Sequence, residues 1–224
     1  TLTVVADGQT KVYGESNPVL TLDYIGFVNL DNADDLDLKP IASTSINELS
    51  HVGSYPNSII LSGGEDNNYV YSLVPGNFDI IKAQLEITAD NKSKVYGQSD
   101  PEFTISFSGF VNGDDASDLT TLPTINIDGD GVNVGEYDIL VAGAQADNYS
   151  VNYHNGKLNV EKAVLTVRAD NKSAYYNQPI PELTITYSGF EYGEDVSNLT
   201  TVPTASTTAL KGSPEGDYDI DVSG

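Results

Sequence analysis

The stretch "ADNKSKVYGQSDPEFTISFSGF", residues 89–110, returns as "ADNKSAYYNQPIPELTITYSGF" at 169–190 and more loosely as "ADGQTKVYGESNPVLTLDYIGF" at 6–27. The match extends to both sides, so the chain contains three copies of one unit with a period of about 80 residues. Solenoid repeats of roughly 20 to 50 residues cannot bury a core alone, whereas a unit of this length can. We therefore predict three domains, which we call module 1 (1–83), module 2 (84–163) and module 3 (164–224).

Module 3 is shorter than the other two. Gly224 aligns with Gly143, so module 3 has no counterpart of residues 144–163, which contain two predicted strands. We expect its core to be open, and we expect the natural chain to continue with a segment of the "NYSVNY" and "NGKLNV" kind. Losing several large apolar side chains, at about 1.5 to 3 kcal/mol each, would remove much of the stability of a small domain.

The composition is strongly acidic. The 33 acidic and 10 basic residues give a formal charge of -23, distributed as -8, -9 and -6 over the three modules. This charge repels phosphate backbones and anionic lipid, so it disfavours nucleic-acid binding and membrane association, and it attracts cations. No apolar run is long enough for a transmembrane span or signal peptide, so we expect any targeting segment to lie outside this sequence. The absence of Cys fits an exported bacterial protein that needs no thiol chemistry.

Apolar residues alternate with polar ones along short segments separated by turn residues. In module 2 the alternating apolar residues are Leu85, Ile87, Phe103, Ile105, Phe107, Tyr137, Ile139, Val141, Tyr149, Val151, Tyr153, Leu158 and Val160. Period-two alternation is typical of half-buried antiparallel strands, and turns every 8 to 12 residues or so are typical of a sandwich or small barrel. We predict an all-β protein of tandem, small antiparallel β-sandwich modules of Ig-like type.

One segment of each module breaks this pattern. "NGDDASDL" (112–119) corresponds to "NLDNADDL" (29–36) and "YGEDVSNL" (192–199). Asn32, Asp115 and Asp195 are suitable N-cap residues, each with Asp or Asn three positions later and then a leucine. The pattern predicts one short helical turn held by its leucine. A helix beside a sheet leaves a β-grasp module open as the alternative fold.

The predicted turns depend on particular residues. Asn155-Gly156 between two strands suits a type I′ hairpin, and Pro75-Gly76 in module 1 suits a type II turn. The last position of "KVYG" is Gly14, Gly97 or Asn177 in the three modules. Asn is the common non-glycine residue that tolerates a left-handed backbone, so this position indicates a backbone requirement.

The junctions between modules contain no flexible linker. Apolar residues occupy even positions before Lys82-Ala83 (Phe78, Ile80) and odd positions after it (Leu85, Ile87), and the parity changes again near Lys162-Ala163. A strand therefore leaves one module and enters the next with its faces exchanged. We expect neighbouring modules to be closely coupled and to form a fairly stiff, monomeric rod.

These features together resemble the MBG-type repeats of large bacterial surface proteins, including haemagglutinin-like adhesins and long secreted proteins of the Bacteroidetes type. The resemblance rests on "DPEFTISFSGFVNGDDASDL", "VGEYDI" and "NYSVNYHNGKLNVEKA" and on the recurrent "YG", and it covers essentially the whole chain. Module 3 departs from it with Asn177 in place of Gly. The resemblance implies an extracellular or secreted, non-enzymatic stalk or adhesive module, and it supplies no catalytic or ligand-binding residues.

The residues offer few candidates for chemistry. Cysteine nucleophiles are absent, and the two histidines, His51 and His154, are not equivalent between modules. His154 is expected in a surface turn, and the tyrosines Tyr13, Tyr96 and Tyr176 in core or inter-sheet packing. No enzyme and no cofactor are predicted.

The best metal candidate is "DGDGVNVGE". Its oxygen ligands for calcium would be Asp128, Asp130, Asn133 and Glu136. Modules 1 and 3 have no matching set at this position, so an ordinary polar turn is the favoured interpretation.

Two function classes follow. The first is a spacer or stalk of a bacterial cell-surface adhesin whose partners are the neighbouring repeats of the same chain. The second is a module whose exposed loops bind glycan or protein.

Overall fold

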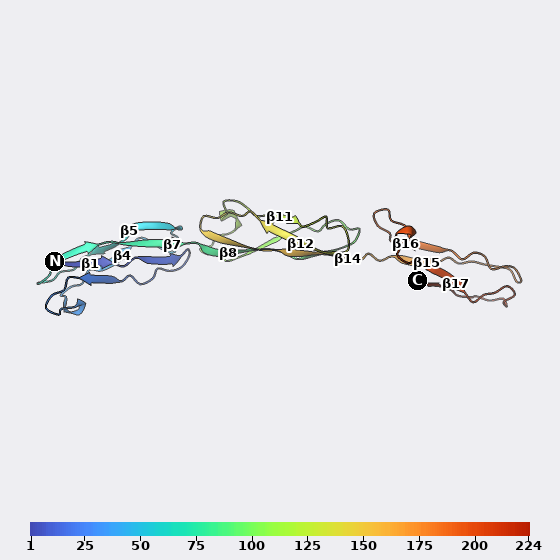
Figure 1. Cartoon of the computed structure of the whole chain (residues 1–224), viewed down its shortest axis with the longest axis horizontal. Coiled ribbons are helices and arrows are strands. Elements are labelled where there is room, and N and C mark those ends of the chain that lie inside the picture. Colours follow the sequence, from blue (N-terminus) through green and yellow to red (C-terminus); the bar gives the residue numbers. More distant parts are fainter. The chain divides into compact units, whose positions relative to one another are not determined.

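The all-β prediction is confirmed by a computed structural model that describes residues 1–224 (Figure 1). Every regular element is a strand except three single turns of 3-10 helix, η1 (Ala33–Asp35), η2 (Ala116–Asp118) and η3 (Val196–Asn198). No helix is therefore long and apolar enough to cross a membrane.

Module 1 consists of two sheets. A three-stranded sheet has the order β3 (Leu22–Ile25), β1 (Leu2–Ala6), β6 (Tyr71–Val74). A four-stranded sheet has the order β2 (Gln9–Val12), β7 (Gly76–Ile81), β5 (Gly53–Ser62), β4 (Ile41–Thr44). The module begins with β1 and β2 and ends with β6 and β7. Each of these two strand pairs contributes one strand to the three-stranded sheet and one to the four-stranded sheet.

Module 2 repeats this arrangement. Its three-stranded sheet has the order β10 (Ile105–Ser108), β8 (Ala83–Ala89), β13 (Tyr149–His154). Its four-stranded sheet has the order β11 (Thr124–Ile127), β12 (Gly135–Ala142), β14 (Gly156–Glu161), β9 (Lys92–Val95). The same strand order in both modules shows that the sequence repeat is a structural repeat.

Parallel strand pairs occur in the modules beside the predicted antiparallel pairs. The first and last strands pair in parallel, β1 with β6 and β2 with β7 in module 1, and β8 with β13 and β9 with β14 in module 2. Alternation of apolar residues reports which face of a strand is buried and says nothing about strand direction. A parallel pair of terminal strands is also a feature of the β-grasp alternative, although only a single helical turn is present here.

The hairpin predicted at Asn155-Gly156 does not form. β13 and β14 belong to different sheets, as do β6 and β7, and neither Asn155 nor Gly156 has a positive φ angle. The glycine is required for space, because a Cβ atom on Gly156 would lie 2.5 Å from the carbonyl oxygen of Ala89. Gly76 has the same relation to Ala6 O, also at 2.5 Å. The dipeptide marks a crossing between sheets at which two backbones come into close contact.

The predictions for the last position of "KVYG" and for the three helical turns are confirmed. Gly14, Gly97 and Asn177 have φ angles of 84°, 90° and 64°. All three helical turns have a complete capping box, in which the N-cap side chain and the side chain three residues later each accept a backbone hydrogen bond. Leu36 and Leu119, which follow two of these turns, are buried.

Burial follows the predicted change of parity. In β7 the buried positions are even (Phe78, Ile80), and in β8 they are odd (Leu85, Ile87), with the single residue Lys82 between the two strands. In module 1 one core cluster joins Leu2, Val4, Leu36 and Tyr69, with Leu22, Tyr24, Phe27, Leu61 and Tyr71 packed against it.

Module 3 contains only two antiparallel pairs. β15 (Thr166–Ala169) pairs with β16 (Ile185–Ser188), and β17 (Thr204–Thr207) pairs with β18 (Ile220–Ser223). No strand in it corresponds to β13 and β14. As expected for an open core, none of its hydrophobic side chains is buried.

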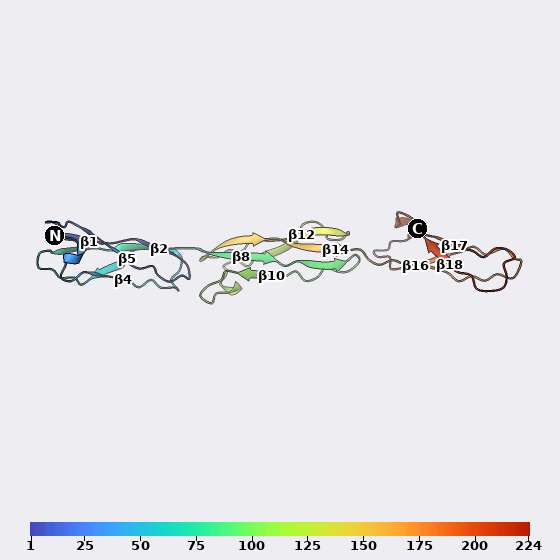
Figure 2. The same cartoon turned by 90° about the horizontal axis from the view of Figure 1, so that it is seen from below.

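The chain divides into two compact units, and the division passes through module 2. The first unit comprises Thr1–Asp90, Phe103–Asn126 and Ile139–Gly156, and the second comprises Asn91–Glu102, Ile127–Asp138 and Lys157–Gly224. Figure 2 gives the second view of the strands in each part. The contact between modules 1 and 2 lies within the first unit, and the contact between modules 2 and 3 lies within the second.

Candidate functional site

A tyrosine of module 1 forms the centre of the contact with module 2. Tyr13 follows β2 and is 4% exposed, and its hydroxyl donates a hydrogen bond of 3.1 Å to Asp114 Oδ2. Its ring packs edge-on against Tyr149, with the ring centroids 5.6 Å apart. The predicted burial of Tyr13 is confirmed. The predicted packing of Tyr13 between the sheets of its own module is wrong, because its ring and hydroxyl contact the neighbouring module.

Asp114 joins the two modules through two hydroxyl groups. Besides Tyr13, it accepts a 2.6 Å hydrogen bond from Tyr149 of its own module. Burial, together with this hydrogen bond to the Asp114 carboxylate, raises the pKa of Tyr149 well above its usual value. Tyr149 therefore remains a protonated donor at any physiological pH.

The glycine after the tyrosine allows the modules to approach each other. A Cβ atom on Gly14 would lie 2.4 Å from Val111 Cγ2, and the positive φ of this residue disfavours any other L-amino acid. The recurrent Tyr-Gly pair thus supplies a hydrogen-bond donor and, next to it, space for a side chain of the following module.

Further hydrogen bonds surround this contact. The Asn148 side chain bridges two residues of module 1: Nδ2 donates to His51 Nδ1 at 2.9 Å, and Oδ1 accepts from the Val52 N–H at 3.1 Å. Asn112 Nδ2 donates to Glu48 O at 2.9 Å, and the linker residue Lys82 donates to Ala146 O at 2.8 Å. We call this set of contacts between modules 1 and 2 the first joint.

A second joint, between modules 2 and 3, has the same tyrosine-to-acid hydrogen bond, but its aromatic partner comes from a different position, since Tyr192 corresponds to Asn112. The Tyr96 hydroxyl donates a 3.0 Å hydrogen bond to Glu194 Oε1, and the Tyr96 ring packs edge-on against Tyr192, with the centroids 5.1 Å apart. The hydrogen bond to Glu194 raises the pKa of Tyr96. A Cβ atom on Gly97 would lie 2.4 Å from Glu191 Cγ, so Gly97 allows the same close approach as Gly14.

The acidic partners come from the segments that the sequence analysis assigned to helix capping. In "GDDASDL" Asp115 and Asp118 form the capping box, whereas the preceding residue, Asp114, faces the joint. The corresponding acid is Asp31 in module 1, where Tyr69 donates to it at 2.7 Å, and Glu194 in module 3. Sequence reasoning missed this role; an acid at the same position of all three modules, one residue before the N-cap, was the available signal.

The calcium candidates lie close together in sequence but make contacts within the chain. Asp130 Oδ1 accepts from the Val132 N–H at 3.0 Å, and Glu136 Oε1 forms a 3.0 Å ion pair with Lys157. The backbone of Asp128 donates to Asp138 O at 2.8 Å, and the backbone oxygen of Asn133 accepts from the Tyr137 hydroxyl. No three His, Asp or Glu side chains of the molecule are arranged as ligands of one metal ion.

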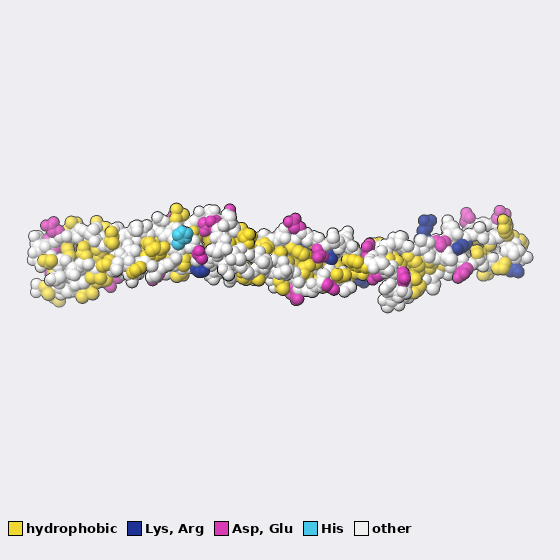
Figure 3. All heavy atoms as spheres, turned by 90° about the horizontal axis from the view of Figure 1, so that it is seen from above, with side chains coloured by type: hydrophobic (Ala, Val, Ile, Leu, Met, Phe, Trp, Pro, Cys, Tyr) yellow, Lys and Arg dark blue, Asp and Glu magenta, His cyan; other side chains and the backbone are white.

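The acidic charge is dispersed. On the face drawn in Figure 3 the Asp and Glu side chains stand singly or in small groups among uncharged atoms. Of the two histidines, His51 contacts Asn148 and stacks on Tyr13, and the exposed His154 pairs with Glu86 at 2.6 Å. Neither histidine hydrogen-bonds a serine or threonine hydroxyl.

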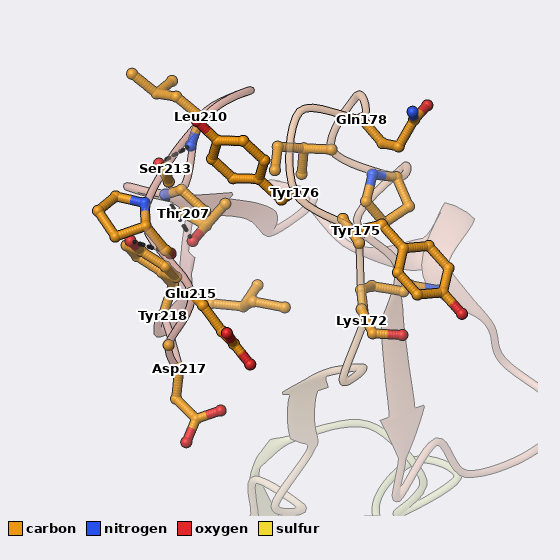
Figure 4. Close-up of a pocket in the computed structure, with 18 of the residues that line it drawn as sticks. Lys172, Tyr175, Tyr176, Gln178, Thr207, Leu210, Ser213, Glu215, Asp217 and Tyr218 are labelled. Atoms are coloured by element: carbon orange, nitrogen blue, oxygen red, sulfur yellow. Dashed lines mark hydrogen bonds between the residues drawn. The ribbon is translucent and has the colours of Figure 1, made fainter.

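Module 3 contains one large hollow, with a volume of about 960 Å³. Figure 4 shows Lys172, Tyr175 and Gln178 on one side and Leu210, Ser213, Glu215, Asp217 and Tyr218 on the other, with the ring of Tyr176 directed toward Leu210. Tyr175 and Tyr176 are 88% and 75% exposed. Tyr176 corresponds to Tyr13 and Tyr96, which are engaged at the joints.

Comparison with known proteins identifies the repeats. The sequence model of the MBG domain (YGX type) family matches three times, at residues 2–79, 85–159 and 165–224. No curated protein and no solved structure matches the chain.

Proposed function

Because the chain belongs to the MBG domain family (YGX type), a non-catalytic repeat family of large surface proteins, we propose that it is a stalk segment of a bacterial adhesin. Its role is to project a distal binding region away from the cell. On this proposal the chain is extracellular, and its principal partners are the neighbouring repeats.

The single observation that carries the proposal is the repeated joint. A spacer has to transmit force and direction from one module to the next, so a limited set of orientations at each junction is more useful than a loose tether. Here a tyrosine of one module donates to a carboxylate of the next at both junctions, at 3.1 Å and 3.0 Å. The linker at the first joint is one residue long.

The contact is well suited to restrict movement. At the first joint the donor Tyr13 is buried, and a hydrogen bond to a charged acceptor there contributes about 1.5 to 3 kcal/mol and is directional. The aromatic rings add edge-on packing of about 0.5 to 1.5 kcal/mol. Together these contributions favour one arrangement over the many that a flexible tether would allow.

The proposal is tested by measuring a distance across the first joint. The chain has no cysteine, so Ser62→Cys and Ser108→Cys place one spin label on each side without further changes. We expect pulsed electron paramagnetic resonance to give a single narrow distribution of distances between the two spin labels. A broad distribution, as for two domains on a tether, would contradict the stalk proposal.

The alternative, a module that binds glycan or protein through its loops, predicts a different result. A glycan array probed with the same chain should give no reproducible signal if the repeats are spacers. Saturable binding to one glycan class, at a strength that survives physiological salt, would favour the adhesive module.

A further inference from the structure

The first segment of module 1, residues 2–12, pairs in parallel with its last segment, residues 71–81. β1 pairs with β6 in the three-stranded sheet, and β2 pairs with β7 in the four-stranded sheet. In both sheets the paired residues are 69 positions apart in the sequence, as in the pair of Leu2 with Tyr71. The two segments therefore change sheets together, without a shift of register.

Module 2 repeats this pairing between its first segment, 83–95, and its last segment, 149–161. The paired residues are 66 positions apart both in β8 with β13 and in β9 with β14. Both ends of module 2 continue directly into neighbouring modules: β7 leads into β8 through the single residue Lys82 (Figure 1). The pairing is thus a property of a module inside the chain.

This pairing determines how a module carries a pulling force. A force transmitted along the chain enters a module at the start of its first segment and leaves at the end of its last segment. Because the two segments are parallel, these points lie at opposite ends of the paired strands, and the force makes the segments slide past each other. The evenly spaced hydrogen bonds of a parallel pair then carry the load at the same time. The part of module 1 between the two segments lies outside this path.

We propose that each pair of terminal segments, 2–12 with 71–81 and 83–95 with 149–161, is a force-bearing clamp. The clamp makes the module resist unfolding when the chain is pulled from its ends. Forced unfolding is governed by the unfolding rate, so the clamp acts by raising the barrier to unfolding. The inference deepens the proposed stalk function, on which the biological use of the clamp rests.

The crossing between the sheets prevents the clamp from sliding. Gly76 lies at this crossing, where a Cβ atom would be 2.5 Å from Ala6 O. Pulling draws the last segment toward its C-terminal end, so a slide of one residue brings Pro75 to this place and a slide of two brings Val74. Both residues have the Cβ atom that the place does not admit. Module 2 has the same close approach at Gly156.

Each segment is also anchored in the remainder of the module. β1 lies between β6 and β3, and β7 lies between β2 and β5. The side chains of Leu2, Val4 and Phe78 on these two central strands are fully buried. Sliding therefore removes apolar side chains from the core at the same time as it breaks the ladder, and both losses add to the barrier.

The test is single-molecule force spectroscopy of the full chain, held by its first and last residues. Modules 1 and 2 should give two high-force events, each releasing about 80 residues at about 3.3 to 3.6 Å per residue. A second geometry holds the chain at Thr1 and at Val70→Cys, which is specific because the chain has no cysteine and is accessible because Val70 is 74% exposed. It separates β1 from β6 one pair at a time. Both end-to-end events should require at least about twofold more force than this opening.

Gln9→Pro weakens the clamp of module 1. The Tyr13 N–H donates to Ile81 O at 2.9 Å, so alternation along the strand directs the Gln9 N–H toward β7 as well. Proline has no N–H and removes this bond from the ladder. One of the two high-force events should therefore fall by at least about one third, while the other stays unchanged and serves as the internal reference.

Ala42→Pro is the matched control, because β4 is the other edge strand of the same sheet. Leu38 and Glu65 exchange two backbone hydrogen bonds, so alternation directs the Ala42 N–H toward β5. The substitution removes a ladder bond outside the clamp. Both proline variants should lower the melting temperature, whereas Ala42→Pro should leave both high-force events unchanged.

Two results would overturn the inference. One is an equal force in the two pulling geometries, and the other is an equal loss of force in Gln9→Pro and Ala42→Pro. The distance measurement across the first joint separates this inference from the stalk proposal. Low forces with a narrow distance distribution would contradict the clamp and support the stalk. High forces with a broad distribution would support the clamp and contradict the stalk.

Discussion

Tyr13 and Asp114 are 101 residues apart in the sequence, yet the tyrosine hydroxyl donates a 3.1 Å hydrogen bond to the aspartate across the first joint. Tyr149 donates to the same carboxylate oxygen at 2.6 Å. One side chain of module 2 thus serves both its own module and its neighbour. A substitution at Asp114 therefore affects both the joint and the stability of module 2, and a control variant is needed to separate the two effects.

Asp114→Ala should loosen the first joint. It removes the acceptor of the buried Tyr13 hydroxyl, and leaving such a group unpaired costs about 1 to 3 kcal/mol, whereas Tyr149 keeps its contacts with the Val111 backbone. We expect a broader distance distribution between labels at Ser62→Cys and Ser108→Cys, with a lower melting temperature.

Asp31→Ala is the matched control for this experiment. Asp31 is the equivalent residue of module 1 and accepts from Tyr69, but it takes no part in the joint. It should lower the melting temperature and leave the distance distribution unchanged. If Asp31→Ala broadens the distribution as much as Asp114→Ala does, general destabilisation explains the effect and the joint does not.

Gly156→Val within the chain should destabilise module 2 by about 1 to 3 kcal/mol. The added side chain meets Ala89 O where a Cβ atom would be only 2.5 Å away, and the crossing strand has no room to move without losing its pairing. Chemical denaturation followed by tyrosine fluorescence measures the loss. Gly8→Ala is the control, because its Cβ would lie 3.7 Å from Asn77 O and its φ is not positive; unchanged stability of Gly156→Val would contradict the close approach.

This crossing also shows where sequence reasoning succeeds and where it fails. The alternation of Leu85 and Ile87 and the capping pattern at Asp115 are local, so the sequence predicts the strands, the buried faces and the helical turns correctly. The partner of a strand is a non-local choice. Asn155-Gly156 fits both a hairpin turn and a crossing between sheets, and only the position of the Ala89 carbonyl distinguishes them.

The same limit applies to the joints. Tyr13 and Asp114 each have a sufficient local explanation, as a buried aromatic residue and as part of an acidic turn. Their contact depends on how two modules pack, which no spacing within one module reports. The repetition of both residues in each module is the only sequence signal, and it becomes meaningful once the joint is seen.

Acid should weaken the helical turns. The hydroxyl and the N–H of Ser117 donate to Asp115 and hold the pKa of that carboxyl below its ordinary value of 3.8, and Ser197 does the same for Asp195. A carboxyl with a lowered folded pKa binds protons more readily in the unfolded chain. Its contribution to stability is therefore complete above about pH 4 and is lost as the pH falls through the lower folded pKa.

Asp115→Asn tests this expectation. The variant keeps an oxygen that can accept from Ser117 but no longer titrates, so its stability should fall less steeply than that of the natural chain between about pH 4 and pH 2. Asp79→Asn is the control, since the exposed Asp79 side chain makes no hydrogen bond or ion pair. Identical pH profiles for Asp115→Asn and the natural chain would show that the capping carboxylate does not contribute to the acid response.

Calcium should stabilise the chain only as a screening ion. The charge of -23 produces self-repulsion within the chain. Any salt weakens this repulsion, and the weakening grows with ionic strength because the Debye length shortens. The loop with Asp128, Asp130, Asn133 and Glu136 is the one place where a specific site was predicted, but Asp130 caps the Val132 N–H and Glu136 pairs with Lys157. A calcium ion needs about six to eight oxygen ligands. To bind here it would have to displace the Val132 N–H from Asp130 and Lys157 from Glu136. We therefore expect the melting temperature to rise equally in calcium chloride and in sodium chloride of matched ionic strength, and Asp130→Ala to leave that rise unchanged. A larger rise at micromolar calcium that Asp130→Ala abolishes would instead establish a calcium site in this loop.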